Sequence, residues 1–296
     1  MTFLGKVTGT LFIWRRSALG DVLWLEPVLD HLSNKYKRII FYSDYPELFE
    51  NYPNHNVQFK KSPKGFLRIF FKAEAFLHSK LVLLNLNDAY EKFPAMHFLN
   101  GYFKSLGISQ YQLRYPKLYL TNAELNKFNN IGKFIVIAIE TTDPQNYRQV
   151  YGVRWNNVVK YFHTQGFQVF ITGKKIKDTF GAVHIDTSIR ELIALINAAK
   201  LFIGIDSGPS HVAAALRVPA IFFFGSVNPA YRHFLNQLNG IILQGECEYA
   251  GCYHKGKTSQ KRICKLVGQS GEPKCCVQTT DTVLKAVESI LSKQHI

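Results

Sequence analysis

The sequence predicts an α/β protein of two Rossmann-like halves that face a central cleft. Two series of alternating buried strands and amphipathic helices support this prediction, one at the start of the chain and one from residue 133 onward. The clearest unit spans residues 201–225, where a strand, a turn, a helix and a second buried strand follow one another. Units of this kind form parallel sheets, and phosphate-bearing ligands bind where the strands end.

The first half opens with a buried strand at 10–14 that leads through a turn into a helix. Asp21 stands at the start of this helix and Pro27 inside it, because apolar residues recur at helical spacing at Val22, Leu25, Val28, Leu29, Leu32 and Tyr36. Further strands are expected at 38–42, 57–59 and 81–86. The turn has one glycine, Gly20, and lacks the three spaced glycines of a dinucleotide fingerprint, which argues against an NAD-type enzyme.

The second half begins after a polar stretch, residues 121–132, that has the composition of an interdomain connection. We therefore expect one domain at 1–128 and a second at 129–296. In the second domain the pattern predicts strands at 133–139, 167–172, 201–205 and 220–224, and helices at 155–162, 188–199 and 282–291. A cysteine-rich segment at 245–276 precedes the closing helix.

The composition limits the classes of function. The 296 residues include 36 Lys and Arg against 21 Asp and Glu, and the net charge of +15 attracts nucleic acid, anionic lipid or phosphorylated sugars, unless it is a plain solvated surface. No apolar run reaches the ~18 residues of a membrane span, and Trp14-Arg15-Arg16 stands where a signal peptide has its cleavage site. Five cysteines, an odd number, do not suit a secreted disulfide scaffold. We expect a cytoplasmic protein, with contact at the inner membrane surface left open.

Small polar residues and a histidine crowd the turn that follows the strand at 201–205. They are Asp206, Ser207, Gly208, Ser210 and His211. Pro209 suits the first position of a helix, and the free N–H groups at a helix start bind anions, so this turn is a candidate phosphate site. Capping of the helix by Asp206 or Ser207, with His211 as an interior histidine, is the alternative.

Two groups of residues are candidates for a site in the first half. Asp21 is either a helix N-cap or a general base at the mouth of the cleft. Lys64, Arg68 and Lys72 fall four residues apart, so a helix would place them in one basic stripe backed by aromatic residues. This stripe is either an ordinary amphipathic surface or a docking site for an anionic acceptor or an anionic membrane.

Cysteines of the second half form a candidate metal set. The set is Cys247, Cys252, Cys264 and either Cys275 or Cys276. The gaps between them are looser than the C-x2-C spacing of zinc ribbons, but thiolates are good ligands for Zn and Fe. Reduced cysteines that bind no metal are the alternative.

Two motifs far apart in the chain together resemble a known family. The turn L-G-D-x5-P at 19–27 and the turn D-S-G-P-S-H-x-A-x-A at 206–215 are similar to those of glycosyltransferase family 9, which holds the ADP-heptose:lipopolysaccharide heptosyltransferases. Arg154-Trp155, Gly173 and residues 188–192 also match, and the resemblance covers nearly the whole chain. It implies a GT-B fold and inverting transfer of a sugar from a nucleotide sugar.

The resemblance also implies roles for individual residues. Asp21 corresponds to the proposed catalytic base, and the donor contacts correspond to Thr141, Thr142, Arg154, Asp206, Ser207, Gly208 and His211. No cofactor is expected for catalysis, because Arg154 and the helix start can stabilise the diphosphate leaving group without a metal. Val153 stands where many relatives have a lysine. Some members resemble this chain in having a C-terminal cysteine set, which makes a structural Zn or Fe an expectation.

Three functions are consistent with these features. The first is transfer of a heptose or related sugar from an ADP- or UDP-sugar to an anionic lipopolysaccharide-core acceptor. The second is a phage-type enzyme that glycosylates hydroxylated bases in DNA, where the basic surplus would contact phosphates. The third is a non-catalytic metal-knuckle protein that binds nucleic acid on a GT-B fold.

Overall fold

The computed structural model describes residues 7–64, 82–140, 146–174, 176–254, 264–268 and 270–293. The chain divides into two compact units, Met1–Leu120 (unit 1) and Thr121–Ile296 (unit 2), so the division falls before the polar stretch rather than at 128/129. The reason is that Thr121 caps helix α5 (Asn122–Asn126) in a capping box with Glu124. Glu124 in turn pairs with Arg190 of unit 2 at 2.7 Å.

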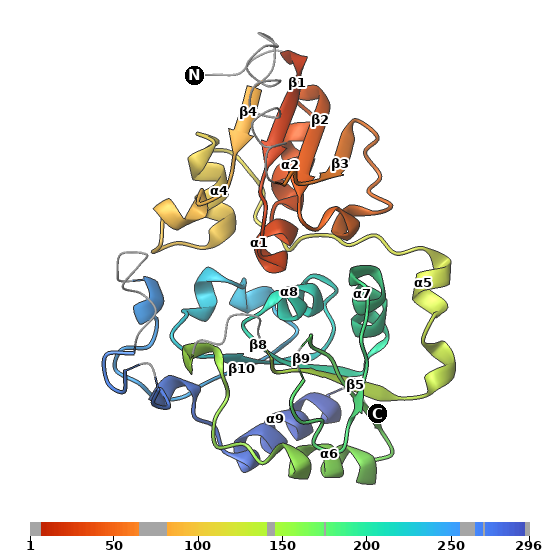
Figure 1. Cartoon of the computed structure of the whole chain (residues 1–296), viewed down its shortest axis with the longest axis vertical. Helices are drawn as coiled ribbons and strands as arrows, with labels where there is room; N and C mark the ends of the chain where they lie inside the picture. The colour runs from red at the N-terminus through yellow and green to blue at the C-terminus, as the bar shows by residue number, and fades with distance from the viewer. Residues whose placement is uncertain are drawn as a thin grey trace. The chain divides into compact units, whose positions relative to one another are not determined.

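Unit 1 contains a parallel sheet with strand order β3-β2-β1-β4 (Figure 1). The strands are β1 (Val7–Trp14), β2 (Tyr36–Ser43), β3 (Val57–Lys61) and β4 (Val82–Asn85). Phe12 of β1 lies between Ile40 of β2 and Leu83 of β4 in the register. Adjacent strand residues point to opposite faces, and Leu11 and Phe12 are both buried, so both faces of the sheet are covered. All four strands expected from the sequence are confirmed.

The helices of unit 1 differ from the expectation after Asp21. They are α1 (Leu19–Leu23), α2 (Glu26–Ser33) and α4 (Phe98–Ser105), with 3-10 turns η1 (Pro46–Phe49) and η2 (Tyr90–Lys92). The prediction of one continuous helix was wrong, because the chain breaks before α2 and Pro27 lies in its first turn. A proline lacks the N–H that a helix interior needs, but the first turn tolerates it. Tyr36 begins β2 instead of ending the helix.

Unit 2 contains a parallel sheet with strand order β10-β9-β8-β5-β6-β7. The strands are β5 (Phe134–Ala138), β6 (Gln168–Ile171), β7 (Val183–His184), β8 (Leu201–Ile205), β9 (Ala220–Phe224) and β10 (Gly240–Gln244). The remaining helices are α6 (Trp155–Thr164), α7 (Ile189–Ala198), α8 (Gly208–Ala215) and α9 (Thr280–Ser292). The strands and helices expected in this half are confirmed, with shifts of a few residues at their ends. The 3-10 turns are η3 (Asn129–Ile131), η4 (Asn146–Arg148), η5 (Pro229–Tyr231), η6 (Leu235–Gln237), η7 (Cys252–His254) and η8 (Lys274–Cys276).

Helices cover both faces of the unit 2 sheet. Helices α6 and α9 lie on one face and α7 and α8 on the other, as Figure 1 shows. Trp155 of α6 and Val287 of α9 belong to one buried cluster with Ile203 of β8 and Ile221 of β9. Two parallel sheets, each buried by helices, confirm the prediction of two Rossmann-like units. No helix in the described ranges has the length and apolar character that crossing a bilayer requires.

Candidate active site

Asp21 lies in the first turn of α1, directly after the carboxyl end of β1. The N-cap position belongs to Ala18, whose backbone has a φ of 66° and whose carbonyl accepts from the Val22 N–H at 3.0 Å. The interpretation of Asp21 as a mere N-cap is therefore wrong. Its side chain is 16% exposed, so the carboxylate can reach a ligand from a largely buried position.

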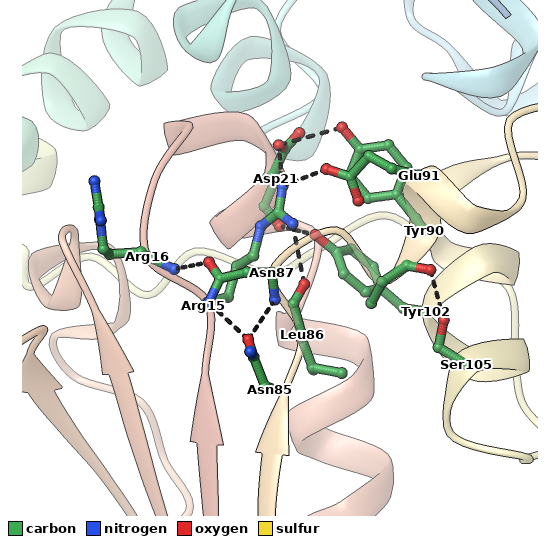
Figure 2. A network of polar contacts seen from close by, with 11 residues as sticks. Arg15, Arg16, Asp21, Asn85, Leu86, Asn87, Tyr90, Glu91, Tyr102 and Ser105 are labelled. Carbon is green, nitrogen blue, oxygen red and sulfur yellow. Dashed lines mark hydrogen bonds and ion pairs between the residues drawn. The ribbon is translucent and has the colours of Figure 1, made fainter. Parts of the chain in front are cut away.

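The buried side chain of Arg15 joins Asp21 to a second carboxylate (Figure 2). Its Nη2 atom lies 2.5 Å from Asp21 Oδ2 and 3.0 Å from Glu91 Oε1. Its Nη1 atom donates to the carbonyl of Leu86 at 3.0 Å. Arg15 follows β1, Leu86 follows β4 and Glu91 lies in η2, so the sheet edge assembles this group from segments far apart in the sequence.

Two tyrosines complete the polar network around Asp21. Tyr90 donates to Asp21 Oδ2 at 3.3 Å, and Tyr102 donates to the Asp21 carbonyl at 3.2 Å. The guanidinium carbon of Arg15 lies 5.3 Å from the centre of the Tyr90 ring and 5.9 Å from that of Tyr102. Cation–π contacts of this kind stabilise a partly desolvated arginine.

The charges of the network act on one another. Burial alone would lower the pKa of Arg15, but Tyr102, Asp21 and Glu91 together raise it well above its ordinary value. Burial raises the pKa of Glu91, the charge of Asp21 adds to the rise, and Arg15 opposes it. Arg15 therefore stays charged, and Asp21 and Glu91 compete for one cation.

In unit 2, the turn between β8 and α8 leaves buried oxygen atoms unsatisfied. Ser207 holds the N-cap position of α8, but its side chain accepts no capping hydrogen bond. Ser207 Oγ and Asp206 Oδ2 are buried and have no hydrogen-bond partner among the described residues. Capping thus does not account for these side chains. Unsatisfied buried oxygens at a helix start, where the first N–H groups have no intrahelical partner, fit a site that a polar ligand completes.

His211 lies in the first turn of α8. It is buried, and its Nε2 atom is 3.7 Å from Asp206 Oδ1. The His211 ring lies against the buried ring of His233 in a tilted arrangement, with centroids 5.1 Å apart. The sequence-predicted donor residues Asp206, Ser207 and His211 therefore do come together, with His233 beside them.

Arg154 stands at the start of α6. It holds the N-cap position, and its backbone N–H donates to Thr280 Oγ1 at 2.9 Å. Its side chain is exposed, and no carboxylate in the described part of the chain pairs with it. A cation without a protein counter-charge is available to an anionic ligand. Thr141 and Thr142, the other expected donor contacts, lie outside the described residues.

Of the three basic residues expected to bind the acceptor, the structure describes one. Lys64 is exposed and follows β3 in an irregular segment. Arg68 and Lys72 lie outside the described residues.

Four of the five cysteines line one small cavity in unit 2. Cys247, Cys252, Cys264 and Cys275 surround a volume of about 20 Å³. This volume accommodates about one particle of the size of a water molecule. All five cysteines are free thiols, and within the described ranges no group of three or more His, Cys, Asp or Glu side chains is arranged so that it could hold a metal ion. The thiols thus share a cavity without forming an assembled metal site.

Cys275 and Cys276 play different roles. Cys275 faces the cavity, whereas the sulfur of Cys276 packs beneath Gly225, where a Cβ atom would lie 2.5 Å from it. The hydrogen bond from Cys276, against burial, lowers the pKa of Cys275, and the same bond raises the pKa of Cys276. The two adjacent thiols thus differ in their surroundings.

Backbone and side-chain contacts hold the cavity walls. The Gly245 N–H donates to the Cys275 carbonyl at 2.9 Å, and the Tyr151 N–H donates to the Cys276 carbonyl at 3.0 Å. The buried side chain of Asn146 donates to the carbonyls of Gly268 at 3.1 Å and Gly271 at 2.7 Å. Asn146 therefore fixes the loop that carries Cys264.

Sequence reasoning did not find several residues of these sites. They are Arg15, Glu91, Tyr90, Tyr102, His233 and Asn146. Arg15 carried a signal, since an arginine directly after a buried strand ends at the edge where ligands bind. The sequence around the other five residues has no such signal, because their positions depend on how distant segments pack.

The fold and the two sheet edges together define a class. Two parallel α/β units, one with a carboxylate at its strand ends and the other with unsatisfied buried oxygens at a helix start, have the architecture of glycosyltransferases that use nucleotide sugars. The sequence profile of glycosyltransferase family 9 (heptosyltransferase) matches residues 82–263, more than half of the chain. The chain belongs to this family.

Similar proteins agree with the assignment. Lipopolysaccharide heptosyltransferase 3 of Escherichia coli is 30% identical over 107 residues, which cover 31% of this chain and 32% of that protein. The chain thus matches about a third of the length of its curated relatives. The glycosyl transferase family 9 structure from Veillonella parvula superposes with a TM-score of 0.74 at 17% identity and covers 99% of both chains. The iron-containing dodecameric glycosyltransferase TibC from enterotoxigenic E. coli superposes with a TM-score of 0.71 at 17% identity, over 99% of this chain and 79% of that one. A second structure of TibC is a complex with ADP-D-beta-D-heptose.

Proposed function

We propose that this protein is an inverting glycosyltransferase that moves a heptose or related sugar from a nucleotide-diphosphate sugar to a hydroxyl of an anionic acceptor. The observation that carries the proposal is the Asp21 carboxylate, held at the end of β1 by Arg15 and Tyr90 and still partly exposed. Its relatives are named as lipopolysaccharide heptosyltransferases, which supports a lipopolysaccharide-core acceptor and an ADP-sugar donor. None of the three relatives described above is named as acting on DNA, so a DNA acceptor gains no support.

The proposed role of Asp21 follows from the chemistry of the acceptor. A hydroxyl is a weak nucleophile until a base takes its proton. The hydroxyl oxygen attacks the anomeric carbon of the donor sugar while its proton passes to Asp21. The bond between that carbon and the diphosphate oxygen breaks, and the diphosphate leaves with the electron pair. Attack opposite the leaving group inverts the configuration at the anomeric carbon.

The start of α8 is proposed to bind the diphosphate. Its N–H groups and helix dipole favour negative charge, which grows on the diphosphate as the bond breaks. Arg154 supplies a cation, and His211 a hydrogen bond. The unsatisfied oxygens of Asp206 and Ser207 accept from hydroxyl groups of the donor.

The surplus of positive charge supports the proposal that the acceptor is anionic. The net charge of +15 raises the local concentration of a phosphorylated acceptor at the surface. We place Lys64, Arg68 and Lys72 on the acceptor side of this proposal. A cytoplasmic protein in peripheral contact with the inner membrane would meet such an acceptor.

We also propose that the cysteine cavity holds one structural Zn or Fe ion. Cys247, Cys252, Cys264 and Cys275 would be its ligands, and four thiolates suit both metals. TibC, whose structure is similar, is an iron-containing protein. When bound, the ion would tie the segment after β10 to η8. It takes no part in the proposed transfer.

The test compares Asp21→Asn with Asp44→Asn. Asp44 is a second partly exposed aspartate at the same sheet edge, 3.7 Å from Arg16. Transfer from ADP-heptose to a lipopolysaccharide-core acceptor should fall by about 10²–10⁴-fold in Asp21→Asn and remain in Asp44→Asn. Donor affinity, measured on the same samples, should stay the same in both. Both variants should remain folded at the assay temperature, which their melting temperatures check. Near-normal transfer by Asp21→Asn would remove Asp21 from the mechanism.

A further inference from the structure

The two carboxylate oxygens of Asp21 have different surroundings. Oδ2 accepts from Arg15 at 2.5 Å and from Tyr90 at 3.3 Å. No hydrogen bond from the described part of the chain reaches Oδ1. Tyr102 holds the Asp21 backbone carbonyl at 3.2 Å. One oxygen is thus fixed, and the other is left to meet a ligand.

We propose that Glu91 and Arg15 are positioning residues that orient Asp21 and set its strength as a base, with Glu91 drawing part of the Arg15 charge away from Asp21. The proposal rests on the proposed function, in which Asp21 takes the acceptor proton. Neither Glu91 nor Arg15 touches the reacting atoms in this scheme. Both act through Asp21.

The physical reason is that an arginine paired with one carboxylate makes that carboxylate a poor base. The guanidinium stabilises the ionised form, so the carboxylate gains less on accepting a proton. Here a single nitrogen, Arg15 Nη2, lies between Asp21 Oδ2 and Glu91 Oε1. Two carboxylates and one guanidinium leave a net charge of −1 in a partly buried group. The charge of Glu91 therefore restores basicity that Arg15 alone would remove.

Arg15 can perform this role because its side chain is held in one conformation. Its Nη1 atom is bonded to the Leu86 carbonyl at 3.0 Å, and the rings of Tyr90 and Tyr102 lie against the guanidinium. Glu91 is held as well, since Ser105 of α4 donates to the Ala89 carbonyl just before η2 at 2.6 Å. A lysine donates from a single nitrogen, so it would lack the two-nitrogen geometry that reaches the Leu86 carbonyl and the two carboxylates here.

The titratable groups around Asp21 come from several elements. Arg15 comes from the end of β1, Tyr90 and Glu91 from η2, and Tyr102 from α4. Tyr45 comes from the segment before η1, and burial, Asp44 and Asp21 raise its pKa. Tyrosines with ordinary or raised pKa values are neutral near pH 7. Of these groups, Arg15 and Glu91 are the ones whose side chains ordinarily carry a charge near pH 7.

The first test needs no substrate. Carbon-13 NMR of the carboxyl groups of labelled aspartates is followed against pH, and the Asp21 signal is assigned by its loss in Asp21→Asn. In Glu91→Gln, which keeps an acceptor for Arg15, the Asp21 signal should titrate about half a pH unit or more below that of the unsubstituted protein. In Arg15→Gln it should titrate at higher pH. Glu47→Gln is the control, because Glu47 pairs with Lys61 at 3.2 Å and should leave Asp21 unchanged.

The second test is the pH profile of sugar transfer. The acid limb of kcat/KM should move to lower pH in Glu91→Gln and to higher pH in Arg15→Gln, with KM for the donor unchanged. If Arg15→Gln does not fold, Glu91→Gln alone decides. An Asp21 signal that stays in place or moves upward in Glu91→Gln overturns the inference, whatever the activity. A shifted signal together with an active Asp21→Asn enzyme overturns the proposed function instead.

Discussion

Glu26 and Arg114 form a two-pronged ion pair that fastens the segment after α4 to α2. Arg114 Nη1 lies 2.5 Å from Oε2, and Nη2 lies 3.2 Å from Oε1. Glu26 is 0% exposed, and its Oε2 also accepts from the Lys117 N–H at 3.0 Å. Arg114 Nη2 reaches Asp30 as well, at 2.8 Å, but Asp30 is 53% exposed. One arginine thus has a buried and an exposed partner.

This contrast predicts unequal effects on stability. Glu26→Gln leaves buried positive charge poorly compensated and should lower the free energy of unfolding of unit 1 by about 3 kcal/mol, the lower end of the range for broken buried pairs because Arg114 keeps Asp30. Asp30→Asn should cost under about 1 kcal/mol, as exposed pairs do. Urea denaturation followed by tryptophan fluorescence measures both. Equal losses would contradict the structural role given to Glu26.

The pair Glu124–Arg190 predicts a dependence of stability on pH. Hydrogen bonds from Arg190, together with those from Thr121 and against the effect of burial, lower the pKa of Glu124 from 4.5 to about 2. A carboxyl with a lowered folded pKa stabilises the fold above its unfolded pKa, and this stability is lost as the pH falls from about 4.5 toward 2. The gap in unfolding free energy between the unsubstituted protein and Glu124→Gln, about 1–3 kcal/mol at pH 7, should therefore close in that range.

Glu191 provides the matched control for this experiment. Lys127 lowers its pKa to about 2 as well, but the side chain is 41% exposed. Solvent screens such a pair, so Glu191→Gln should have a smaller effect that fades with added salt. Glutamine keeps both capping boxes, so the substitutions isolate the charge. A larger effect at Glu191 than at Glu124 would contradict this ranking.

Buried runs and turn residues made most of the fold predictable from the sequence. The strand at 201–205 and the strand at 220–224 have the same bounds in the structure, because continuous apolar runs between turn residues leave little freedom. The helix after Asp21 was the main error. Its apolar period continues through Trp24 and Leu25, and periodicity alone cannot show that Pro27 starts a new helix.

The candidate site was predictable only in part. Motif spacing located Asp21 and the turn at Asp206, because the ends of parallel strands meet at one edge. Glu91 lies 76 residues from Arg15 in the sequence, and their contact depends on how β4 and η2 pack. The different surroundings of Cys275 and Cys276 depend on the close packing of the Cys276 sulfur against Gly225, and no rule of sequence spacing predicts that contact.

The donor turn predicts a ranking of affinities. Arg154→Ala and His211→Gln should each weaken binding of ADP by roughly 1–3 kcal/mol, the range for lost charge-assisted hydrogen bonds. Lys200→Ala is the control, since Lys200 is exposed and precedes β8 at the opposite end of the strand. Isothermal titration calorimetry gives the affinities. If Lys200→Ala weakens ADP binding as much as Arg154→Ala does, the loss of affinity comes from the lower net charge and not from a specific contact of Arg154.

The adjacent cysteines give the sharpest test of the metal proposal. Cys275 lines the cavity with three other thiols, whereas Cys276 packs beneath Gly225. Cys275→Ser should therefore remove bound Zn or Fe from the purified protein, because a serine hydroxyl is a poor ligand for these metals. Cys276→Ser should keep the metal at one ion per chain and lower the melting temperature through the polar atom placed in a packed site.

Elemental analysis of both variants and of the unsubstituted protein, prepared without chelators, measures the outcome. Metal binding adds its free energy to folding, so a chelator should lower the melting temperature of the unsubstituted protein and of Cys276→Ser but leave Cys275→Ser unchanged. Asn146→Ala should lower the metal affinity by about 10–100-fold, since Asn146 holds the loop of Cys264 through Gly268 and Gly271. Metal-free unsubstituted protein with normal stability would leave the four thiols as reduced cysteines that pack around an ordinary cavity.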